Sequence, residues 1–397
     1  MGSRSPATEA PTVVLGAGYA GLATWHGVHR LARGRWPVVV VDRHPVHVLR
    51  TELYQVGAIA AHEGAVSRWA LPLRTLLRGD SSSILTGDVT SIDLKRRTVR
   101  VDGAPLDYRE LAICLGSVPA YYGIPGAVEH SFDVYRLSHA EKLGQALVES
   151  LGSRGAEGAP VRVLVVGGGS TGTEVAADLA TVRWPRIVGR PCPRLTVLLV
   201  AGKVPLLAGL PEPLVRYARE SLHRSGVLVD EGRNVREVQA DCVTLDDGTV
   251  IPFDVCVWAA GVEPPALVSA LKVPRGRGRR LAVDEHLELP GYPGVVAVGD
   301  VAEFVDPTTR AATPATAQAA LAEAPVAAAN LVARRLGGPL RPFRYRERGV
   351  IVSLGRTRAS GSVGGLSLWG RPAALLKLAV QTGVRFAGPR GGRAPGL

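Results

Sequence analysis

The sequence predicts an α/β protein made of two similar units, in each of which helices cover a parallel β-sheet. In the stretch TVVLGAGYAG an apolar run, Thr12 to Leu15, ends at three glycines spaced G-x-G-x-x-G before a helix-like segment. The same succession returns 151 residues later, where the apolar run VRVLVV precedes GGGSTGTE. The last part of the chain differs from both units because it is basic and only partly apolar. The predicted fold class is therefore two Rossmann-like dinucleotide-binding domains with a C-terminal basic extension.

The first glycine motif carries the features that a dinucleotide needs. Gly16 permits the tight turn from strand to helix, Gly18 lets a pyrophosphate approach the backbone, and Gly21 lets the helix pack closely. The phosphates then meet free N–H groups at the start of the helix expected over 22–31. A second apolar strand ends at Asp42, 21 residues after Gly21, where a carboxylate binds the ribose. Together these features predict a dinucleotide site.

The second motif places Gly167, Gly169 and Gly172 at the same spacing after the apolar run 161–166. One Rossmann unit binds one dinucleotide, so two motifs imply two cofactors that face each other. The usual pair is a flavin held tightly by the first unit and a nicotinamide nucleotide that visits the second.

The remaining elements follow from periodicity and turn residues. We expect a short amphipathic segment over 67–77 and a helix over 313–331 that starts at a Thr-Pro cap and is kinked or broken by Pro325. Asp102–Gly103 and 246–248 are hairpin turn signals. The other expected strands are 38–41, 84–89, 98–101, 111–115, 195–200, 253–259 and 294–300, and the other helices are 138–151, 173–180 and 213–225.

These elements suggest a division of the chain into consecutive parts. The expected parts are a disordered leader 1–11, a first nucleotide domain 12–152, a second nucleotide domain 160–275, a return to the first domain over 281–340, and a C-terminal membrane or dimer segment 341–397.

Composition excludes several classes of protein. With 46% hydrophobic and 21% charged residues, the 397-residue chain is typical of a globular protein. The four cysteines are scattered, which argues against a flavin disulfide reductase and favours a reducing compartment. No run of about 18 apolar residues predicts a transmembrane helix. His44 and His47 are spaced like a metal pair, but no third ligand lies near, so we interpret them as loop histidines beside a nucleotide and predict no metal.

The C-terminal segment carries most of the net charge of +12. Its residues 341–397 contain eleven arginines and lysines against a single acid, Glu347, and leucines and Trp369 lie between the cations. This pattern fits an interfacial helix on an anionic membrane. The alternative is a basic segment that forms a homodimer. Nucleic acid is not an expected partner, because few aromatic residues are present for base stacking.

Several motifs in order resemble one family. They are GAGYAG with Asp42, LYQV at 53–56, ICLGS at 113–117, GGGSTGTE, WAAGV at 258–262, AVGD at 297–300 and the PATAQ run at 314–318. Together with the basic apolar tail, they resemble type II NADH dehydrogenases, the single-subunit NADH:quinone oxidoreductases.

The resemblance implies roles for particular residues. Gly16, Gly18, Gly21 and Asp42 would hold the pyrophosphate and adenosine ribose of FAD, Asp300 the ribityl side, and Gly116 would lie where the backbone passes the flavin. Gly167, Gly169, Gly172 and Gly261 would receive NADH. Glu174 would lie near the nicotinamide and flavin, and Ala317 and Gln318 near the flavin face that quinone uses.

The implied activity is hydride transfer from NAD(P)H to FAD followed by electron transfer to a quinone or another small acceptor, without proton pumping. The implied location is cytoplasmic, peripheral at the inner face of the cell membrane. Quinone reduction also takes up protons, and Glu174 is the candidate acid. Gln318 could hydrogen-bond a quinone carbonyl, and Lys377 could face the same cavity as Gln318. Two other interpretations stay open: a soluble reductase of a protein carrier or small molecule, and a flavoprotein sensor.

Two of these residues also have plain structural interpretations. Glu174 could serve only as an acid in the first turn of its helix, and Gln318 could be a surface residue of its helix.

Two positions depart from the family pattern. The acid that usually ends the second strand of the nicotinamide unit is replaced by Ala201, with Lys203 nearby, so NADPH becomes a possible substrate beside NADH. The tail is shorter than the family's membrane-binding extension and ends in GPRGGRAPGL.

Overall fold

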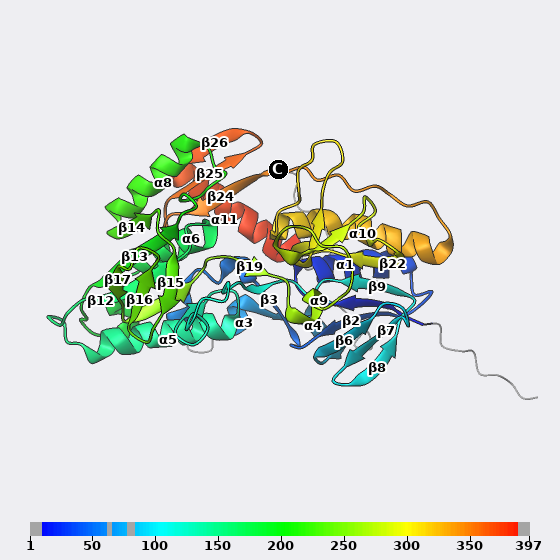
Figure 1. Cartoon of the computed structure of the whole chain (residues 1–397), viewed down its shortest axis with the longest axis horizontal. Coiled ribbons are helices and arrows are strands. Elements are labelled where there is room, and N and C mark those ends of the chain that lie inside the picture. Colours follow the sequence, from blue (N-terminus) through cyan, green and yellow to red (C-terminus); the bar gives the residue numbers. More distant parts are fainter. Residues whose placement is uncertain (1–9, 62–65, 78–83, 388–397) are drawn as a thin grey trace, which may run out of the picture.

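The computed structural model describes residues 10–61, 66–77 and 84–387, arranged as two lobes with the C-terminal segment beside them (Figure 1). The predicted leader falls almost entirely outside the described residues, and so does the end of the tail, 388–397. No helix in the described part of the chain is long and apolar enough to cross a membrane.

The first lobe is built on a six-stranded sheet in the order β21-β22-β9-β1-β2-β5. The four central strands are parallel and apolar: β1 (Thr12–Leu15), β2 (Val38–Asp42), β9 (Glu110–Ile113) and β22 (Tyr292–Ala297). The edges are β5 (Ile84–Thr86) and the antiparallel β21 (Glu288–Leu289). Since β22 lies beside β9, the chain returns to the first sheet after completing the second.

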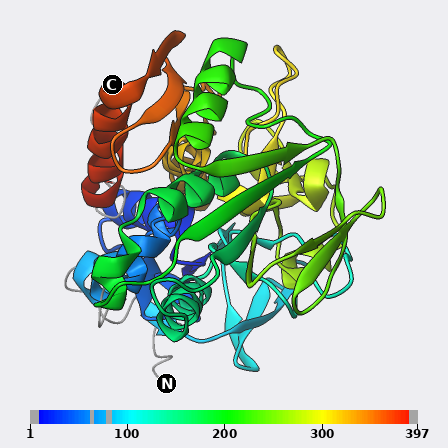
Figure 2. The same cartoon turned by 90° about the vertical axis from the view of Figure 1, so that its left-hand side faces the viewer.

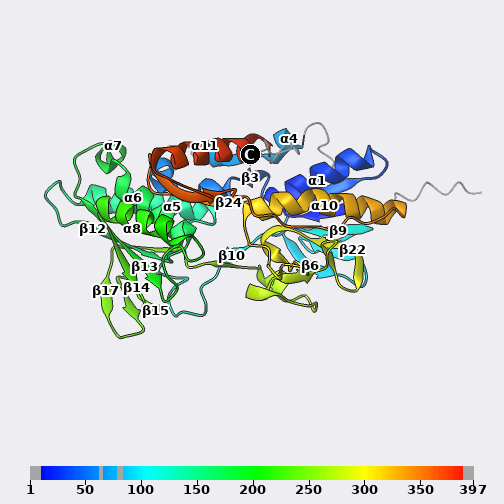
Figure 3. The ribbon, with the colours of Figure 1, turned by 90° about the horizontal axis from the view of Figure 1, so that it is seen from above.

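Helices α1 (Tyr19–Ala32) and α10 (Ala317–Leu336) lie side by side over this sheet (Figure 3). They approach closely because Gly27 has no side chain: a Cβ there would lie 2.6 Å from the Cβ of Ala328. An antiparallel sheet of β6 (Val89–Asp93), β7 (Thr98–Val101) and β8 (Ala104–Asp107) packs against the same apolar core. The strand predicted over 84–89 is therefore two strands in different sheets, separated at Gly87.

The second lobe has a five-stranded parallel sheet in the order β11-β18-β12-β13-β14. Its strands are β11 (Phe132–Asp133), β12 (Val161–Val166), β13 (Leu195–Gly202), β14 (Val227–Glu231) and β18 (Val255–Trp258). Helices α5 (Leu137–Ser153), α6 (Ser170–Thr181) and α8 (Glu212–Arg224) contribute apolar side chains to its core. Thus β11 and α5, which the sequence analysis assigned to the first domain, adjoin the second sheet.

Several short elements complete the two lobes. The second lobe carries a hairpin sheet of β15 (Val235–Val238), β16 (Cys242–Leu245) and β17 (Val250–Pro252), and the strands β10 (Val118–Pro119) and β19 (Val262–Glu263) pair between the lobes. The others are β3 (Val46–Val48), β20 (Leu281–Val283), β23 (Ala302–Phe304), α2 (Val56–Ala60), α7 (Trp184–Val188) and α9 (Ala266–Ser269), with 3-10 turns at Arg50–Glu52, Arg277–Arg279 and Gly299–Val301.

Two predicted elements differ in the structure. The segment 67–77 is not one amphipathic unit but α3 (Val66–Trp69), β4 (Ala70–Pro72) and α4 (Leu73–Leu76), because β4 pairs with β3. Helix α10 is capped by the Thr316 hydroxyl, which accepts from Ala319 N, and not by Thr313. It continues through Pro325, whose ring is exposed, so the carbonyl that loses its N–H partner there can be hydrated.

The C-terminal segment adds a three-stranded sheet and a helix to the second lobe, and its Val352 and Leu354 side chains belong to the apolar core of that lobe. Strands β24 (Gly349–Ser353), β25 (Ala359–Val363) and β26 (Leu366–Trp369) make an antiparallel sheet, followed by helix α11 (Gly370–Ala387). This segment covers one flank of the second lobe (Figure 2), and the hydroxyl of Ser360 donates to Leu214 O of α8. It therefore packs against α8 and against α6, the helix that begins at the second glycine motif.

Candidate dinucleotide sites and acceptor cavity

The first glycine turn has the geometry that its spacing predicts. Gly16 has φ +94°, and its N–H donates to Val41 O at 2.7 Å, which fixes the turn beside β2. A Cβ on Gly21 would lie 1.8 Å from Gly16 O, so only glycine fits there. A Cβ on Gly18 would meet nothing within 4 Å, and no side chain caps the start of α1. The open space and the free N–H groups fit a pyrophosphate.

The second glycine turn repeats this geometry almost atom for atom. Gly167 has φ +121°, its N–H donates to Val200 O at 2.8 Å, and a Cβ on Gly172 would lie 1.9 Å from Gly167 O. Gly169 faces open space, and α6 begins without a side-chain cap. Both turns therefore fit the phosphates of a dinucleotide.

The Asp42 carboxylate contacts the backbone of the first glycine turn. Its Oδ2 accepts from Ala17 N at 2.7 Å, and its Oδ1 accepts from His44 N at 2.9 Å. His47 is buried, and its Nδ1 bonds Ala17 O at 2.8 Å, which requires Nδ1 to carry the hydrogen. Burial lowers the pKa of His47, so the ring is neutral, and its buried Nε2 has no partner among the described residues. An unpaired buried acceptor beside the glycine turn fits a site shaped for a bound group.

The ends of β9 and β22 bring together Ser117 and Asp300, which are 183 positions apart in sequence. The Ser117 hydroxyl donates to Asp300 Oδ2 at 2.7 Å, and Arg50 Nη2 donates to Ser117 O at 3.0 Å. Gly116 has φ +67°, and a Cβ there would lie 3.2 Å from the Arg50 guanidinium. Since β9 and β22 continue the sheet beside β1, Gly116 and Asp300 lie at the same edge as the first glycine turn.

Behind this edge lies a buried acid that sequence reasoning missed. Glu323 on α10 accepts from Gly299 N at 2.7 Å, and burial raises its pKa to about 8. The group is therefore largely protonated at neutral pH and contributes no charge beside Asp300.

Glu174 on α6 is bound by the C-terminal segment. Its Oε1 accepts from the Lys377 ammonium and from Ser353 N, the latter at 2.9 Å, and Lys377 also donates to Ile351 O at 2.9 Å. The two side chains are only 10% and 13% exposed. Glu174 lies beyond the first turn of α6, so the interpretation of this acid as one that serves only the start of its helix is wrong.

A network of polar side chains extends this ion pair. The Tyr54 hydroxyl lies 3.0 Å from Ser353 Oγ and accepts from Gln381 Nε2 at 3.3 Å. The Lys377 ammonium lies 5.3 Å from the centre of the Tyr54 ring, a cation–π contact. Residues from the segment before α2, from β24 and from α11 thus surround one ion pair.

These residues line a cavity of about 1250 Å³ formed by α2, α6, α7, β24 and α11. Part of its wall is apolar, and this part includes Ala58, Val182, Ile187, Leu354, Leu375 and Leu378. Six arginines also line it: Arg68, Arg183, Arg186, Arg356, Arg358 and Arg371. Lys377 lines this cavity together with Glu174, whereas the expectation placed it in a quinone cavity shared with Gln318.

Asp178 lines the same cavity one helical turn after Glu174. Its Oδ2 accepts from Gly57 N at 3.0 Å, which ties α2 to α6. Burial raises the pKa of this carboxyl to about 7. The four-residue spacing between Glu174 and Asp178 places both side chains on one face of a helix. The sequence could therefore have indicated Asp178 as a second acid of this site.

Gln318 does not line this cavity. Its Nε2 donates to Gly349 O at 3.2 Å, and its Oε1 accepts from Arg348 N at 2.9 Å. Ala317 begins α10 next to it. Since Ser353 binds Glu174, the two candidate catalytic residues hold opposite ends of β24. Gln318 is thus bound to the C-terminal segment rather than being a free surface glutamine.

Gly261 follows β18 at the second glycine turn. Its φ is +136°, and a Cβ there would lie 2.5 Å from the Tyr122 hydroxyl oxygen. The Tyr122 hydroxyl donates to Ala260 O at 3.1 Å, and Gly261 O accepts from Ala120 N at 3.0 Å. These contacts join the segment 120–122 to the end of β18. They place Gly261 next to the glycine turn that is expected to bind the nicotinamide nucleotide.

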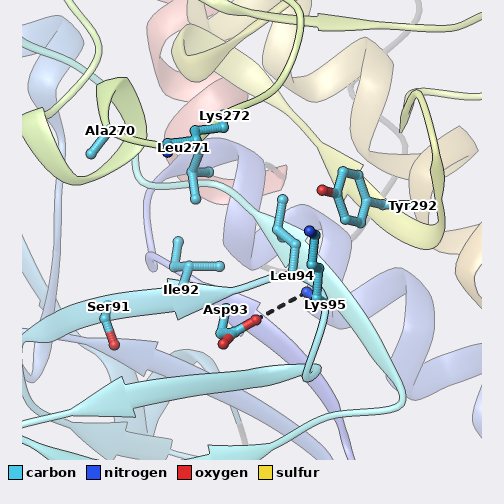
Figure 4. A pocket seen from close by; sticks show the side chains of 9 residues that line it. All are labelled: Ser91, Ile92, Asp93, Leu94, Lys95, Ala270, Leu271, Lys272 and Tyr292. Atoms are coloured by element: carbon cyan, nitrogen blue, oxygen red, sulfur yellow. Dashed lines mark hydrogen bonds between the residues drawn. The ribbon is translucent and has the colours of Figure 1, made fainter.

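A second, shallower cavity of about 390 Å³ lies elsewhere on the first lobe, between the β6–β7 hairpin and the segment after α9 (Figure 4). Lys95, Lys272 and Tyr292 are among its lining residues, and none of the predicted site residues reaches it. Among the described residues, no group of three or more His, Cys, Asp or Glu side chains could hold a metal ion.

Large apolar side chains are exposed on the C-terminal segment near the arginine-lined cavity. They are Leu366, Trp369, Leu375 and Leu378, all more than half exposed. Arg358 and Arg371 are exposed beside them. Apolar side chains among cations make this surface unlike the rest of the second lobe.

Comparison with known proteins identifies relatives over nearly the whole chain. The profile of the pyridine nucleotide-disulphide oxidoreductases matches residues 10–324. The NADH dehydrogenase-like protein YutJ of Bacillus subtilis is 28% identical over 92% of this chain and 96% of its own. The type II NADH:quinone oxidoreductase of Staphylococcus aureus is 26% identical over 94% of each chain.

A solved structure shows the same fold. NDH2 from Plasmodium falciparum in complex with NADH superposes with a TM-score of 0.79 at 16% identity, covering 96% of both chains. An α/β fold with parallel sheets is therefore the shared architecture.

Proposed function

This chain belongs to the pyridine nucleotide-disulphide oxidoreductase family, and we propose that it is an FAD-dependent NAD(P)H:quinone oxidoreductase acting at a membrane surface. Proteins of this family use FAD and NAD(P)H. The resemblance to type II NADH dehydrogenases is supported by both curated relatives named above. The acceptor and the location are the parts of this proposal that go beyond family membership.

The first lobe would hold FAD. Gly16, Gly18 and Gly21 offer backbone N–H groups to the pyrophosphate, Asp42 lies where the adenosine ribose is bound, and Asp300 would bind the ribityl chain. FAD, when bound, accepts a hydride from the reduced nicotinamide and passes two electrons to the acceptor. The second lobe would bind the nicotinamide nucleotide at Gly167, Gly169 and Gly172, with Gly261 beside it. The protein's part is to align the two groups and exclude water.

The observation that carries the quinone proposal is the cavity lined by Glu174 and Lys377. Its apolar wall suits an apolar ring and chain, whereas its acids suit the uptake of protons that quinone reduction requires. The Lys377 ammonium keeps a proton next to Glu174 Oε1, and Asp178 holds one near neutral pH. All four cysteines are free and scattered, so no dithiol supports a disulfide substrate.

The membrane part of the proposal rests on the exposed face of the C-terminal segment. Leucines in the interface would contribute apolar burial that is insensitive to salt, and the arginines would be attracted to anionic lipid. With this face on the inner surface of the cell membrane, a long-chain quinone could enter the cavity from the lipid. A homodimer formed through this face is the competing arrangement.

The test combines an acceptor assay with a lipid assay on the flavin-loaded protein. Anaerobic reduction by NADH or NADPH, followed by stopped-flow reoxidation, should be fast with long-chain quinones in anionic liposomes and slow with soluble protein carriers. Leu375→Ser and Leu378→Ser together should weaken liposome flotation severalfold. Leu228→Ser is the matched control, because its leucine is equally exposed on β14, away from the cavity.

The outcomes separate the candidate functions. If the full chain stays off anionic liposomes at low salt and reduces soluble carriers faster than quinones, the soluble-reductase function replaces this one. If neither nucleotide reduces the flavin, the protein is a sensor rather than an enzyme. If the leucine variants abolish a dimer and leave flotation unchanged, the C-terminal face is a dimer interface.

A further inference from the structure

The second glycine turn lacks the acid that the first one has. Gly16 N donates to Val41 O, and the next residue of β2 is Asp42; Gly167 N donates to Val200 O, and the next residue of β13 is Ala201. The strand register is equally matched, since Leu15 pairs with Val41 and Val166 pairs with Val200. Ala201 therefore occupies the place from which an acid reads the ribose 2′-hydroxyl.

A neutral side chain has taken over one structural task of that acid. In the first unit, Asp42 Oδ1 accepts from the N–H of His44, two residues further on. In the second unit, the corresponding N–H of Lys203 donates at 2.9 Å to Oδ1 of Asn234, an amide from the loop after β14. The turn thus keeps its shape without a carboxylate, and a 2′-phosphate would meet no negative charge at position 201.

The carboxylates of Glu231 and Asp246, near this turn, already accept hydrogen bonds or pair with a cation of the protein. Glu231 at the end of β14 accepts from Leu206 N at 2.8 Å with one oxygen and from Arg219 at 2.9 Å with the other. Lys203 contacts Asp246 at 2.7 Å, but this lysine is 63% exposed, and exposed pairs exchange readily for a stronger anion. The side chain of Lys203 is therefore available to a dianionic phosphate.

We propose that the second dinucleotide site accepts the 2′-phosphate of NADPH, with Ala201 as the specificity-determining residue and Lys203 as the cation that pairs with the phosphate. This inference rests on the proposed function only in taking the second lobe to bind the nicotinamide nucleotide. It deepens that function, because it makes NADPH the preferred reductant rather than an alternative to NADH.

The test uses adenosine fragments that lack the nicotinamide, so no turnover is involved. Calorimetry on the full-length flavin-loaded protein should show that 2′,5′-ADP binds at least about tenfold more tightly than 5′-AMP, as one charge-assisted hydrogen bond would produce. Ala201→Asp restores the residue of the first unit and should reverse this preference. Lys203→Ala should lower the affinity for 2′,5′-ADP about tenfold and leave that for 5′-AMP unchanged.

Lys272→Ala is the matched control, since this exposed lysine lies on the first lobe at the shallow cavity. Equal or tighter binding of 5′-AMP by the wild-type protein overturns the inference and leaves the proposed function intact. Absence of binding by both fragments overturns the two together, because the second lobe would then bind no adenine nucleotide.

Discussion

Replacing Glu174 by Gln tests whether the buried ion pair serves both the fold and the reaction. The amide oxygen of the new side chain can still accept from Ser353 N, so the change removes little except the negative charge. The Lys377 ammonium, 13% exposed, would then lie without a counterion and would donate only to neutral acceptors, the new amide oxygen and Ile351 O.

The expected cost follows from that burial. Removing one partner of a buried pair costs about 3 to 5 kcal/mol, and the retained neutral acceptors place the cost of Glu174→Gln at about 3 kcal/mol. Lys377→Met should cost a similar amount, because it strands the carboxylate. The double variant should lose no more than either single one, since neither charge is then left alone.

Urea unfolding measures the stabilities, and stopped-flow traces measure flavin reduction and reoxidation separately. We expect reoxidation by quinone to slow about a hundredfold in Glu174→Gln, because the carboxylate that positions the Lys377 proton donor is lost, while reduction by the nucleotide stays within a few-fold. Glu288→Gln is the control, because Glu288 is a buried carboxylate paired with Arg334 in the first lobe. It should destabilise the protein without slowing reoxidation.

Additive costs in the double variant would refute the claim that the two charges stabilise each other. Equal slowing of both half-reactions would show that Glu174 acts on the flavin rather than on the acceptor.

Two further predictions follow from the glycine turns and from Asp178. Gly18→Trp should purify without flavin, whereas Gly169→Trp, at the matching open position, should stay yellow but fail to be reduced by NADH or NADPH; a yellow Gly18→Trp would contradict the assignment of the first lobe. Burial raises the pKa of Asp178 from 3.8 to about 7, so between these values the folded state keeps a proton that the unfolded chain has lost, and stability falls as pH rises. Asp178→Asn can still accept from Gly57 N and should remove this dependence, worth at most about 3 kcal/mol between pH 5 and pH 8 in urea unfolding; an unchanged pH dependence would contradict it.

The local part of the architecture could be predicted from the sequence. Glycines such as Gly16 and Gly167 mark turns whose geometry depends on neighbours in sequence and on the adjacent strand, and both have a positive φ. The family resemblance is confirmed, because it rested on motifs in a fixed order. The cap of α10 was predicted three residues early, since Thr313 and Thr316 are equally suitable caps and only tertiary contacts choose between them.

The long-range part of the site could not be predicted with the same certainty. Lys377 and Ser353 lie 203 and 179 residues from Glu174, and no local pattern specifies that they meet. Gln318 illustrates the same limit: the resemblance indicated its neighbourhood, but its contacts to Arg348 and Gly349 depend on how the C-terminal segment packs. The protonated state of Asp178 likewise arises from burial that only the folded chain creates.

The interrupted first sheet has a consequence for biosynthesis. All strands of the second sheet lie between residues 132 and 258, so this lobe can fold as soon as it leaves the ribosome. The first sheet cannot be completed until β22 has been translated. At about 5 to 20 residues per second, this happens about 10 to 40 s after β9 is translated. During that interval the apolar edge of β9 has no neighbouring strand. A nascent chain that binds flavin could do so only after β22 has been added. Chaperones that shield strand edges would therefore act on the first lobe, although it is the first to be synthesised.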